Sequence, residues 1–386
     1  MWRLNFIFVI IVFIILISSC SDEKRSEQTN HKVEVTDWPI FRGNNRLSGV
    51  SNTKITEKPK LLWSYKTGNK IKSSPVIGKG YVFIGSNDGN VYAIDQKNGK
   101  KIWQFDTTDD VEAPPLLLDQ TIYVGSLSGF FFALDALSGK SKWKYETGGQ
   151  IYGSANWVSL AGENYYRILV GSYDNLMYCF NSSTGDVIWT FETDNYINGA
   201  PASDGNLVVF GGCDEKLHVL SVSDGEKITQ VDAGSYIAGS AALVNDKAYL
   251  GHYGNKLICI DLTKEKIIWE YGDEEGDAFF SSPAVNERYV LIGSRDRSLY
   301  CIDRKNGKKI WQFHALDDID SSPVICIDKV IVGSSDGRLY MLNLSDGSLV
   351  WSYDIGSPVI SSPAIANGRI IIASADGQVY CFGDTP

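Results

Sequence analysis

Short apolar runs separated by polar turns repeat along almost the whole chain, and residues 73–103 show one complete unit. The Asn87-Asp88-Gly89 stretch inside it is a tight hairpin signal, because glycine readily adopts the positive φ that such turns need. The apolar runs around it predict four short strands, at residues 75–77, 81–84, 91–94 and 101–105. Connections this short mean that each strand pairs antiparallel with its neighbour.

The same unit returns seven more times at a nearly constant spacing. The residue that opens its middle turn recurs at intervals of 40, 46, 40, 40, 42, 40 and 40, as Gly85, Gly125, Gly171, Gly211, Gly251, Gly293, Gly333 and Ala373. A period of roughly 40 to 45 residues with several strands per period is typical of a propeller blade. One such sheet cannot bury both of its faces, whereas copies stacked around an axis cover every face and leave only short edges.

The two ends of the repeat complement each other. The eighth copy, residues 361–382, lacks the outer strand that carries tryptophan, and residues 61–65 supply such a strand before the first copy, with Trp63 placed 40 residues before Trp103. We therefore predict an all-β fold, an eight-bladed β-propeller of four-stranded antiparallel blades. In this fold the N-terminal strand pairs into the last blade and Trp63 lies alongside Tyr380. An open array of blades is the alternative.

The repeats also define the domain organisation. A chain of 386 residues is long enough for two or three domains, but the repeats leave no room for a second core, so residues 37–386 are predicted to be one propeller. Residues 1–20 read as a targeting segment, with Arg3 followed by an apolar run over residues 4–17. That run is short for a membrane-spanning helix and fits a signal peptide.

The end of this segment resembles a known processing site. Ile17-Ser18-Ser19-Cys20 resembles the bacterial lipoprotein box, which implies that Cys20 is lipidated. Residues 21–36 are polar and lack aromatic side chains, as expected of a flexible tether. Ser21 after the cysteine is similar to lipoproteins sent to the outer membrane, and the Asp22-Glu23 pair resembles a surface-export signal of Bacteroidetes-type bacteria. Whether the ring faces the periplasm or the cell surface stays open, and an ordinary secretory peptide with a chance cysteine is the alternative.

Composition narrows the range of partners. The net charge is −10 and no segment carries a cluster of Lys and Arg, so nucleic acid is not an expected partner. Besides Cys20, four cysteines occupy the same third-strand position in different blades and two lie elsewhere; they are Cys179, Cys259, Cys301, Cys381, Cys213 and Cys326. The four read as small apolar fillers, and we predict neither a zinc site nor a disulfide.

A family resemblance enters at the third turn of each unit. The pattern Ala93-x-Asp95-x-x-x-Gly99-x-x-x-Trp103 resembles the tryptophan-docking motif of propellers in the pyrroloquinoline quinone (PQQ) enzyme superfamily. Residues 37–43 also resemble a short segment that precedes the first repeat in such proteins. The resemblance implies that each tryptophan packs on the glycine turn of an adjacent blade. The docking residues would be Trp63, Trp103, Trp143, Trp189, Trp269, Trp311 and Trp351. Thr229 replaces the tryptophan of blade four, and Glu265 replaces the glycine before Trp269.

Two subfamilies lead to different functions. PQQ-dependent dehydrogenases bind the quinone with Ca²⁺ and carry an adjacent Cys-Cys pair, which this chain lacks, as it also lacks a Cys-x-x-Cys-His haem motif. The outer-membrane assembly-factor lipoproteins are bare eight-bladed rings of nearly this length on a lipid tether. This second resemblance implies a non-enzymatic, monomeric ring, without cofactor, that acts as a scaffold for other cell-envelope proteins. A PQQ-dependent oxidoreductase and a glycan- or small-ligand-binding propeller remain the alternatives.

Candidate recognition residues precede the small residue pairs, such as Ser73-Ser74, that suit the crowded axis. The eight residues at this position differ from one another although the repeat around them does not, and they should line the mouth of a funnel: Lys72, Glu112, Tyr152, Asn198, Ala238, Phe280, Asp320 and Ile360. A position that varies while its neighbours repeat can serve recognition, although unconstrained sequence drift in an exposed loop would give the same pattern of variation. A ligand-binding ring would need an aromatic funnel around Tyr152 and Phe280.

Acidic side chains recur on the same predicted face, mostly for structural reasons. A turn-forming aspartate occupies the matching place of the middle turn in most blades, which explains nearly all of these residues: Asp88, Asp174, Asp214, Asp296, Asp336 and Asp376. Residues 271–277 together with Asp317, Asp318 and Asp320 form an acidic sector able to hold Ca²⁺ or a basic partner, although a solvated rim explains it as well. His252 has no spaced partner for metal binding. Blade three has an insertion around residues 159–166, expected on the opposite face, where Tyr165 and Tyr166 offer a docking point.

Overall fold

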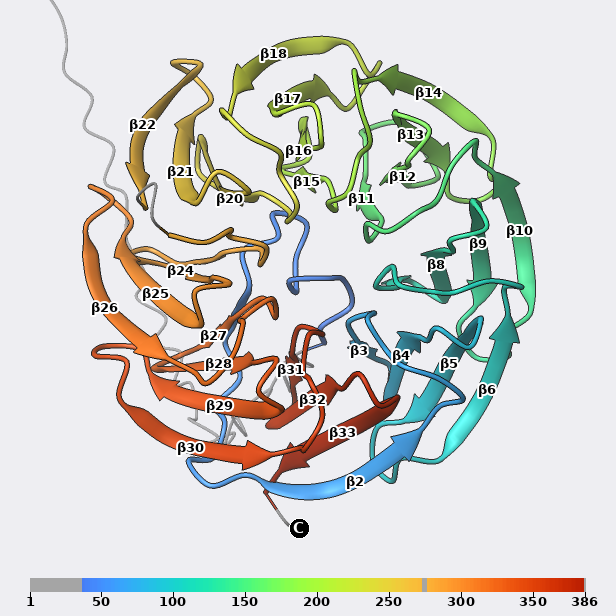
Figure 1. The fold of residues 1–386 in the computed structure, drawn as a ribbon. Coiled ribbons are helices and arrows are strands. Elements are labelled where there is room, and N and C mark those ends of the chain that lie inside the picture. The colour runs from blue at the N-terminus through green and yellow to red at the C-terminus, as the bar shows by residue number, and fades with distance from the viewer. Residues whose placement is uncertain (1–36, 273–275, 385–386) are drawn as a thin grey trace, which may run out of the picture. The chain divides into compact units, whose positions relative to one another are not determined.

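The computed structural model describes residues 37–272 and 276–384, and these form a closed ring of eight sheets. Figure 1 looks down the axis of this ring, with the chain passing from blade to blade in sequence order. Every blade has four antiparallel strands, which run in chain order from the axis outward in blades one to seven, and the eight-bladed all-β prediction is confirmed. Within the described ranges, no helical segment is long and apolar enough to cross a bilayer.

The strand bounds follow the repeat closely. Blades one to three are β3 (Val76–Gly78), β4 (Tyr81–Gly85), β5 (Asn90–Asp95), β6 (Lys101–Asp106); β7 (Leu116–Leu118), β8 (Thr121–Gly125), β9 (Phe130–Asp135), β10 (Ser141–Glu146); β11 (Asn156–Val158), β12 (Arg167–Gly171), β13 (Leu176–Asn181), β14 (Val187–Glu192). Blades four to six are β15 (Ala202–Ser203), β16 (Leu207–Gly211), β17 (Lys216–Ser221), β18 (Lys227–Asp232); β19 (Ala242–Val244), β20 (Lys247–His252), β21 (Lys256–Asp261), β22 (Lys266–Tyr271); β23 (Ala284–Val285), β24 (Tyr289–Gly293), β25 (Ser298–Asp303), β26 (Lys309–His314). Blades seven and eight are β27 (Val324–Cys326), β28 (Lys329–Gly333), β29 (Arg338–Asn343), β30 (Leu349–Asp354); β31 (Ala364–Ala366), β32 (Arg369–Ala373), β33 (Gln378–Gly383) and β2 (Lys60–Lys66), while the short β1 (Val50–Ser51) pairs with β27.

The ring closes through the strand from the N-terminal side. β2 pairs antiparallel with β33 and forms the outer strand of blade eight, as predicted. The register differs by one residue from the expectation, because Trp63 lies opposite Cys381 and it is Ser64 that lies opposite Tyr380. A bulge between Leu61 and Trp63 shifts the pairing, and the same irregularity precedes the outer-strand tryptophan in blade one, where Trp103 faces Ala93.

Tryptophans of the outer strands join neighbouring blades. The Trp103 Nε1 donates a hydrogen bond of 2.9 Å to the carbonyl oxygen of Ala136 in blade two. A Cβ atom added to Gly139 would lie 2.7 Å from the Trp103 ring, and φ at Gly139 is +70°. Only glycine therefore allows the ring to lie this close to the turn. Trp351 is different and packs on Phe382, because the third and outer strands of blade eight come from opposite ends of the chain and no turn joins them.

The junction between blades four and five lacks both partners of this contact. Thr229 stands where the tryptophan of blade four would be, opposite Val219, and Glu265 stands where the receiving glycine of blade five would be, with φ of 54°. At the docked junctions the added Cβ would lie 2.5–2.8 Å from the indole. The two departures from the repeat are thus coupled, because a side chain at 265 is tolerated only where no indole has to be accommodated.

This coupling predicts a double-mutant result. Thr229→Trp alone should gain no stability, because the Glu265 side chain blocks the new indole. Thr229→Trp combined with Glu265→Gly should be more stable than the two single changes predict, by a coupling free energy of about 1–3 kcal/mol. Urea unfolding of the four proteins measures it, and strictly additive effects would contradict the proposed junction.

Serine hydroxyls form a ladder around the axis. In each link, a backbone amide of one blade donates to a serine Oγ of the next, at distances of 2.8–3.1 Å; the links are Ala200 to Ser240, Ser240 to Ser282, Ser282 to Ser322, Ser322 to Ser362 and Ser362 to Ser74. Blade two has Pro114 at this position, which has neither an amide hydrogen nor a hydroxyl. Small residues are therefore required here for hydrogen bonding between blades as well as for space.

Residues 38–51 form a strap that crosses the ring at the far ends of the innermost strands. Its backbone bonds to one blade after another; the contacts run from Trp38 to Ile77, Pro39 to Leu117, Asn45 to Ser203, Arg46 to Leu243, Ser48 to Val285 and Gly49 to Ile325. Blades three and eight are reached through side chains, between Asn156 and the Asn45 carbonyl at 2.7 Å and between Ser51 and the Ile365 carbonyl at 3.3 Å. The strap thus contacts all eight blades, and we call this side of the ring the strap face.

Candidate functional site

The funnel face is the side opposite the strap, where the crossing loops and middle turns lie. A hollow of about 190 Å³ opens at its centre. Seven of the eight predicted funnel residues line it: Lys72, Glu112, Tyr152, Asn198, Ala238, Phe280 and Asp320. Ile360 is not among them, and blade eight contributes only Ser362.

The strap supplies the floor of this hollow. Phe41 lines it from below, and the neighbouring Arg42 is 1% exposed. The Arg42 guanidinium donates to the carbonyl oxygens of Ser322 and Pro323 at 3.2 and 2.6 Å. Burial lowers the pKa of Arg42 to about 9. The funnel is therefore a closed depression, a feature that the motif over residues 37–43 did not reveal.

The charged funnel residues occur as neutralised pairs. The Lys72 ammonium lies 2.8 Å from the Glu112 carboxylate. Across the funnel, Arg295 donates two hydrogen bonds of 3.0 Å to the two oxygens of Asp320, and its guanidinium carbon lies 3.5 Å from the centre of the Phe280 ring. Each of these two carboxylates is therefore already paired with a cation.

Aromatic side chains gather in one sector of the funnel face, over blades three to six. We call this set the aromatic arc; it comprises Tyr152, Tyr173, Tyr196, Tyr236, Tyr253 and Phe280. Tyr152 and Tyr173 have ring centres 4.5 Å apart, and Tyr173 stacks on Tyr196 at 4.8 Å with an angle of 6°. Tyr253 meets Tyr236 at 6.5 Å and Phe280 at 4.6 Å. Tyr196, Tyr236 and Tyr253 are 44–48% exposed.

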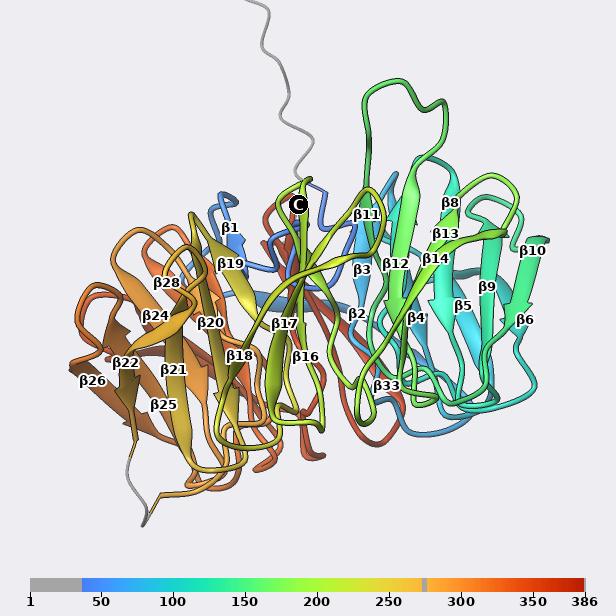
Figure 2. The same ribbon diagram turned by 90° about the horizontal axis from the view of Figure 1, so that it is seen from above.

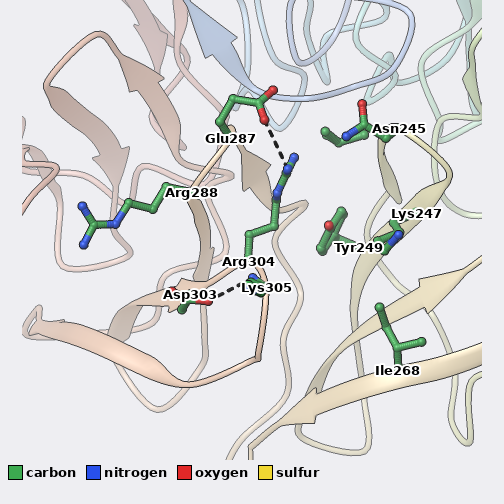
Figure 3. Close-up of a pocket in the computed structure, with 10 residues that line it drawn as sticks. Asn245, Lys247, Tyr249, Ile268, Glu287, Arg288, Asp303, Arg304 and Lys305 are labelled. Atoms are coloured by element: carbon green, nitrogen blue, oxygen red, sulfur yellow. Dashed lines mark hydrogen bonds and ion pairs between the residues drawn. The ribbon is translucent and has the colours of Figure 1, made fainter.

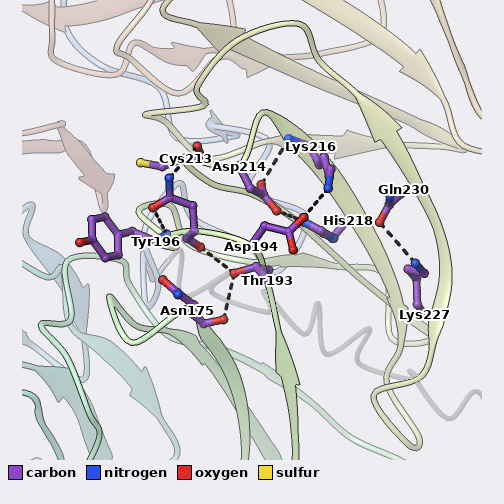
Figure 4. A network of polar contacts seen from close by, with 11 residues as sticks. Asn175, Thr193, Asp194, Tyr196, Cys213, Asp214, Lys216, His218, Lys227 and Gln230 are labelled. Carbon is purple, nitrogen blue, oxygen red and sulfur yellow. Dashed lines mark hydrogen bonds and ion pairs between the residues drawn. The ribbon is translucent and has the colours of Figure 1, made fainter.

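Four members of the arc were missed by the sequence prediction. Tyr173 and Tyr253 follow the first two residues of the middle turn, and Tyr196 and Tyr236 lie two positions before the predicted funnel residues. The residues at both positions differ from blade to blade. The criterion that identified the predicted funnel residues, variation at one position of an otherwise constant repeat, would therefore have found these four as well. Figure 4 shows one arc residue, Tyr196, with Cys213 nearby. The backbone amide of Cys213 donates to the carbonyl of Tyr196 at 2.9 Å.

Most of the recurrent turn aspartates serve the fold. Their carboxylates accept hydrogen bonds from a third-strand hydroxyl, at 2.5–2.7 Å, in the pairs Asp88–Tyr92, Asp174–Tyr178, Asp296–Tyr300 and Asp336–Tyr340. His218 takes the place of tyrosine against Asp214 at 2.7 Å, as Figure 4 shows, and Ser374 contacts Asp376. His252 is 3% exposed, its Nδ1 accepts from the Gly254 amide, and burial lowers its pKa.

The predicted acidic sector is only partly described, because residues 273–275 lie outside the described ranges. Burial and the nearby Asp320 and Asp317 raise the pKa of Asp318, while Asp320 is paired with Arg295. Within residues 37–272 and 276–384, no three His, Cys, Asp or Glu side chains are grouped so as to hold a metal ion. The six cysteines of these ranges are free thiols. Cys20 lies outside them.

The insertion of blade three projects from the ring between β11 and β12, on the side that carries β1 (Figure 2). Tyr165 and Tyr166 line a hollow of about 260 Å³ between blades two and three. The Tyr165 hydroxyl donates to Glu163 at 3.1 Å, and Glu163 also pairs with Arg167 at 2.6 Å. The insertion is therefore ordered by its own contacts, and it lies away from the aromatic arc.

Comparison with known proteins places the chain in a family. The family model described as outer membrane protein assembly factor BamB matches residues 53–165, 159–316 and 295–385. The assembly factor BamB of Nitrosomonas eutropha is 25% identical over 160 residues, which are 37% of this chain and only 38% of that relative.

Solved structures show the same fold. BamB from Moraxella catarrhalis superimposes with a TM-score of 0.72 at 20% identity, over 85% of this chain and all of that one. The quinohemoprotein alcohol dehydrogenase of Comamonas testosteroni reaches 0.76 at 15% identity, over 91% of this chain and 81% of that one. These likenesses show the fold, and the family model, which matches along nearly the whole ring, decides between them: the chain belongs to the family of the outer membrane protein assembly factor BamB.

Proposed function

We propose that this protein is a lipid-anchored scaffold of the cell envelope that binds partner proteins through its funnel face. The observation that carries the proposal is the aromatic arc, in which three tyrosines are 44–48% exposed. Tyrosine is enriched in the energetically dominant parts of protein interfaces, because it offers a large rigid surface and a polar end. The pairs Lys72–Glu112 and Arg295–Asp320 lie at opposite ends of the arc and fix the orientation of a partner.

The family gives the setting of the proposal. Relatives are named as outer membrane protein assembly factors, so the partners proposed here are other proteins of outer-membrane assembly. Cys20 is the proposed site of lipidation, and residues 21–36 the tether that joins it to the ring. A flexible tether of this length spans on the order of 20–24 Å, which keeps the ring near the membrane and leaves it free to turn.

The residues of the funnel favour binding over quinone chemistry. The dehydrogenases would require a carboxylate set for Ca²⁺, but Glu112 and Asp320 are engaged by Lys72 and Arg295. The hollow between them is about 190 Å³ and is closed below by Phe41. We therefore propose no catalytic role for these side chains.

Photocrosslinking in native membranes tests the proposal. A crosslinking residue in place of Tyr236 should capture an outer-membrane assembly protein, and Tyr196→Ser with Tyr253→Ser should weaken capture by about 30-fold, if the two aromatics together contribute about 2 kcal/mol. Ile102, which is 45% exposed on an outer strand of blade one, is the control position.

Cys20→Ala should release the protein from the membrane fraction.

Three outcomes would contradict this function. Equal capture from positions 236 and 102 would remove the role of the arc. Stoichiometric uptake of PQQ with Ca²⁺, accompanied by dye reduction, would favour a dehydrogenase. Saturable binding of a soluble oligosaccharide that depends on Tyr236, without protein capture, would favour a glycan-binding ring.

A further inference from the structure

A second hollow lies between blades five and six, on the strap face and away from the funnel. It measures about 440 Å³ and is formed by the inner turns of both blades, the outer turn of blade six and the outer strand of blade five. Figure 3 shows Arg304 in its middle, with Tyr249 and Asn245 on the opposite wall and Ile268 at the edge.

The lining of this hollow is cationic, although the chain as a whole carries a net charge of −10. Lys247, Arg288, Arg304 and Lys305 line it against two acids, Glu287 and Asp303. Lys247 also lies 3.6 Å from the carboxylate of Asp261 behind the lining. Asp303 is occupied by its own turn, where it accepts from the Lys305 and Asn306 amides at 3.0 and 3.2 Å. The hollow therefore attracts anions.

Arg304 is incompletely satisfied. Its Nη2 donates to Glu287 at 3.2 Å, but the Glu287 side chain is 90% exposed, and ion pairs of exposed carboxylates are weak. Its Nη1 is buried and has no hydrogen-bond partner in the described part of the chain. A buried guanidinium nitrogen without an acceptor is unfavourable, so an anion that displaces Glu287 and bonds both nitrogens would be stabilised.

The same position in the other blades shows that the fold does not need this side chain. Its backbone oxygen accepts the docking tryptophan of the preceding blade, here Trp269 at 3.0 Å, and any residue can provide that oxygen. In blades one to five and seven, where a turn follows the third strand, the equivalent residues are uncharged: Gln96, Ala136, Ser182, Val222, Leu262 and Leu344.

Other arginines that reach between blades are satisfied by the fold. Arg167 donates to the carbonyl oxygens of Val222 and Ser223 at 2.9 and 2.6 Å, and Arg369 donates to the carbonyl of Gln96. Arg304 has no such carbonyl contact among the described residues. Of these three arginines, only Arg304 therefore keeps hydrogen-bonding capacity that the fold does not use.

We propose that the hollow between blades five and six is a binding site for a phosphate group, with Arg304 as the principal ligand. A guanidinium binds phosphate through two parallel hydrogen bonds, and Lys247 and Lys305 add positive charge around it. The ring of Tyr249 and the 37% exposed Ile268 form an apolar wall beside the cations. A phosphate with an apolar body, as in a lipid headgroup, fits this combination better than free phosphate. The site is independent of the funnel and of the function proposed for it.

Calorimetric titration of the full chain tests the site with two soluble probes, inorganic phosphate and dihexanoyl phosphatidylglycerol below its micelle concentration. Both should bind saturably, and Arg304→Leu should weaken both at least tenfold. Leucine is compatible with the tryptophan dock, because Leu344 at the equivalent position accepts the Trp311 Nε1 hydrogen at its carbonyl oxygen, at 2.9 Å. Arg338→Leu, which removes the same charge from a 39% exposed side chain at the start of the third strand of blade seven, should change binding less than twofold.

The probes also identify the source of the phosphate. Binding of the lipid at least tenfold tighter than phosphate assigns the site to a headgroup, and equal binding assigns it to a soluble phosphate compound. Equal losses in the two arginine variants, or no saturable binding of either probe, would overturn the proposal. The crosslinking of Tyr236 is expected to be unaffected by Arg304→Leu, so failure of this site and failure of the funnel are distinguishable.

Discussion

Replacing Trp103 by alanine is expected to lower the free energy of unfolding by about 3–5 kcal/mol, the range for large aromatic residues removed from a core. The indole is 8% exposed, packs against Phe83 at 5.9 Å between ring centres, and donates its only polar hydrogen to Ala136 at 2.9 Å. Its loss leaves a cavity at the junction of blades one and two and removes the donor to that carbonyl. Because blades contact only their neighbours, this junction should become the first to open.

Urea denaturation followed by tryptophan fluorescence measures this effect, with Trp351→Ala as the matched control. Trp351 packs on Phe382 at 5.6 Å but has no turn glycine to cover, and it is partly exposed. Its removal should therefore be clearly less destabilising. Equal losses for the two variants would mean that the contact with the glycine turn contributes nothing beyond burial of the indole.

Raising the pH above 10 is expected to destabilise the ring steeply. Burial, and then the hydrogen bond to a turn aspartate, raise the pKa values of Tyr92, Tyr178, Tyr300 and Tyr340 well above the usual value near 10. Between that value and the folded pKa, the unfolded chain has lost these protons while the folded ring keeps them. The contribution of these four tyrosines to stability is thus complete below about pH 10 and is lost as the pH rises. Arg42, whose pKa is lowered, acts in the opposite direction but is a single group.

Thermal unfolding between pH 8.5 and 11.5 measures the slope. Changing the four tyrosines to phenylalanine should lower stability at pH 8.5, because each aspartate loses a hydrogen bond worth about 1 kcal/mol, and should flatten the alkaline decline. Tyr236→Phe is the control, since this residue is 48% exposed, and it should keep the parental slope. An unchanged slope in the fourfold variant would show that other groups cause the alkaline loss.

Local pattern was sufficient for most of the fold. The turn over residues 87–89 pairs strands that are adjacent in the chain. Residues 61–65 were assigned to blade eight only because Trp63 lies one repeat length before Trp103. The small error at Trp63 came from the bulge after Leu61, which adds a residue without changing the apolar pattern. The funnel residues were located because each precedes a small pair whose place at the axis is set by crowding.

The remainder of the candidate sites depended on contacts between blades. Tyr173 and Tyr196 stack across a junction, and no pattern within one repeat reports which residue of the next repeat lies beside it. The path of the strap was equally hidden, since residues 38–51 have no periodicity and their hydrogen bonds go to eight different blades.

The sequence by itself determined the number of blades, the order of strands and the closure of the ring, because these rest on hairpins formed by neighbouring segments and on a period that repeats eight times. The folded ring was needed to see that Arg42 is buried beneath the funnel, that six aromatic rings share one sector, and that Arg304 has no carbonyl partner among the described residues. The physical reason is that these features arise between blades, where the curvature of the ring, rather than any local periodicity, determines which side chains meet.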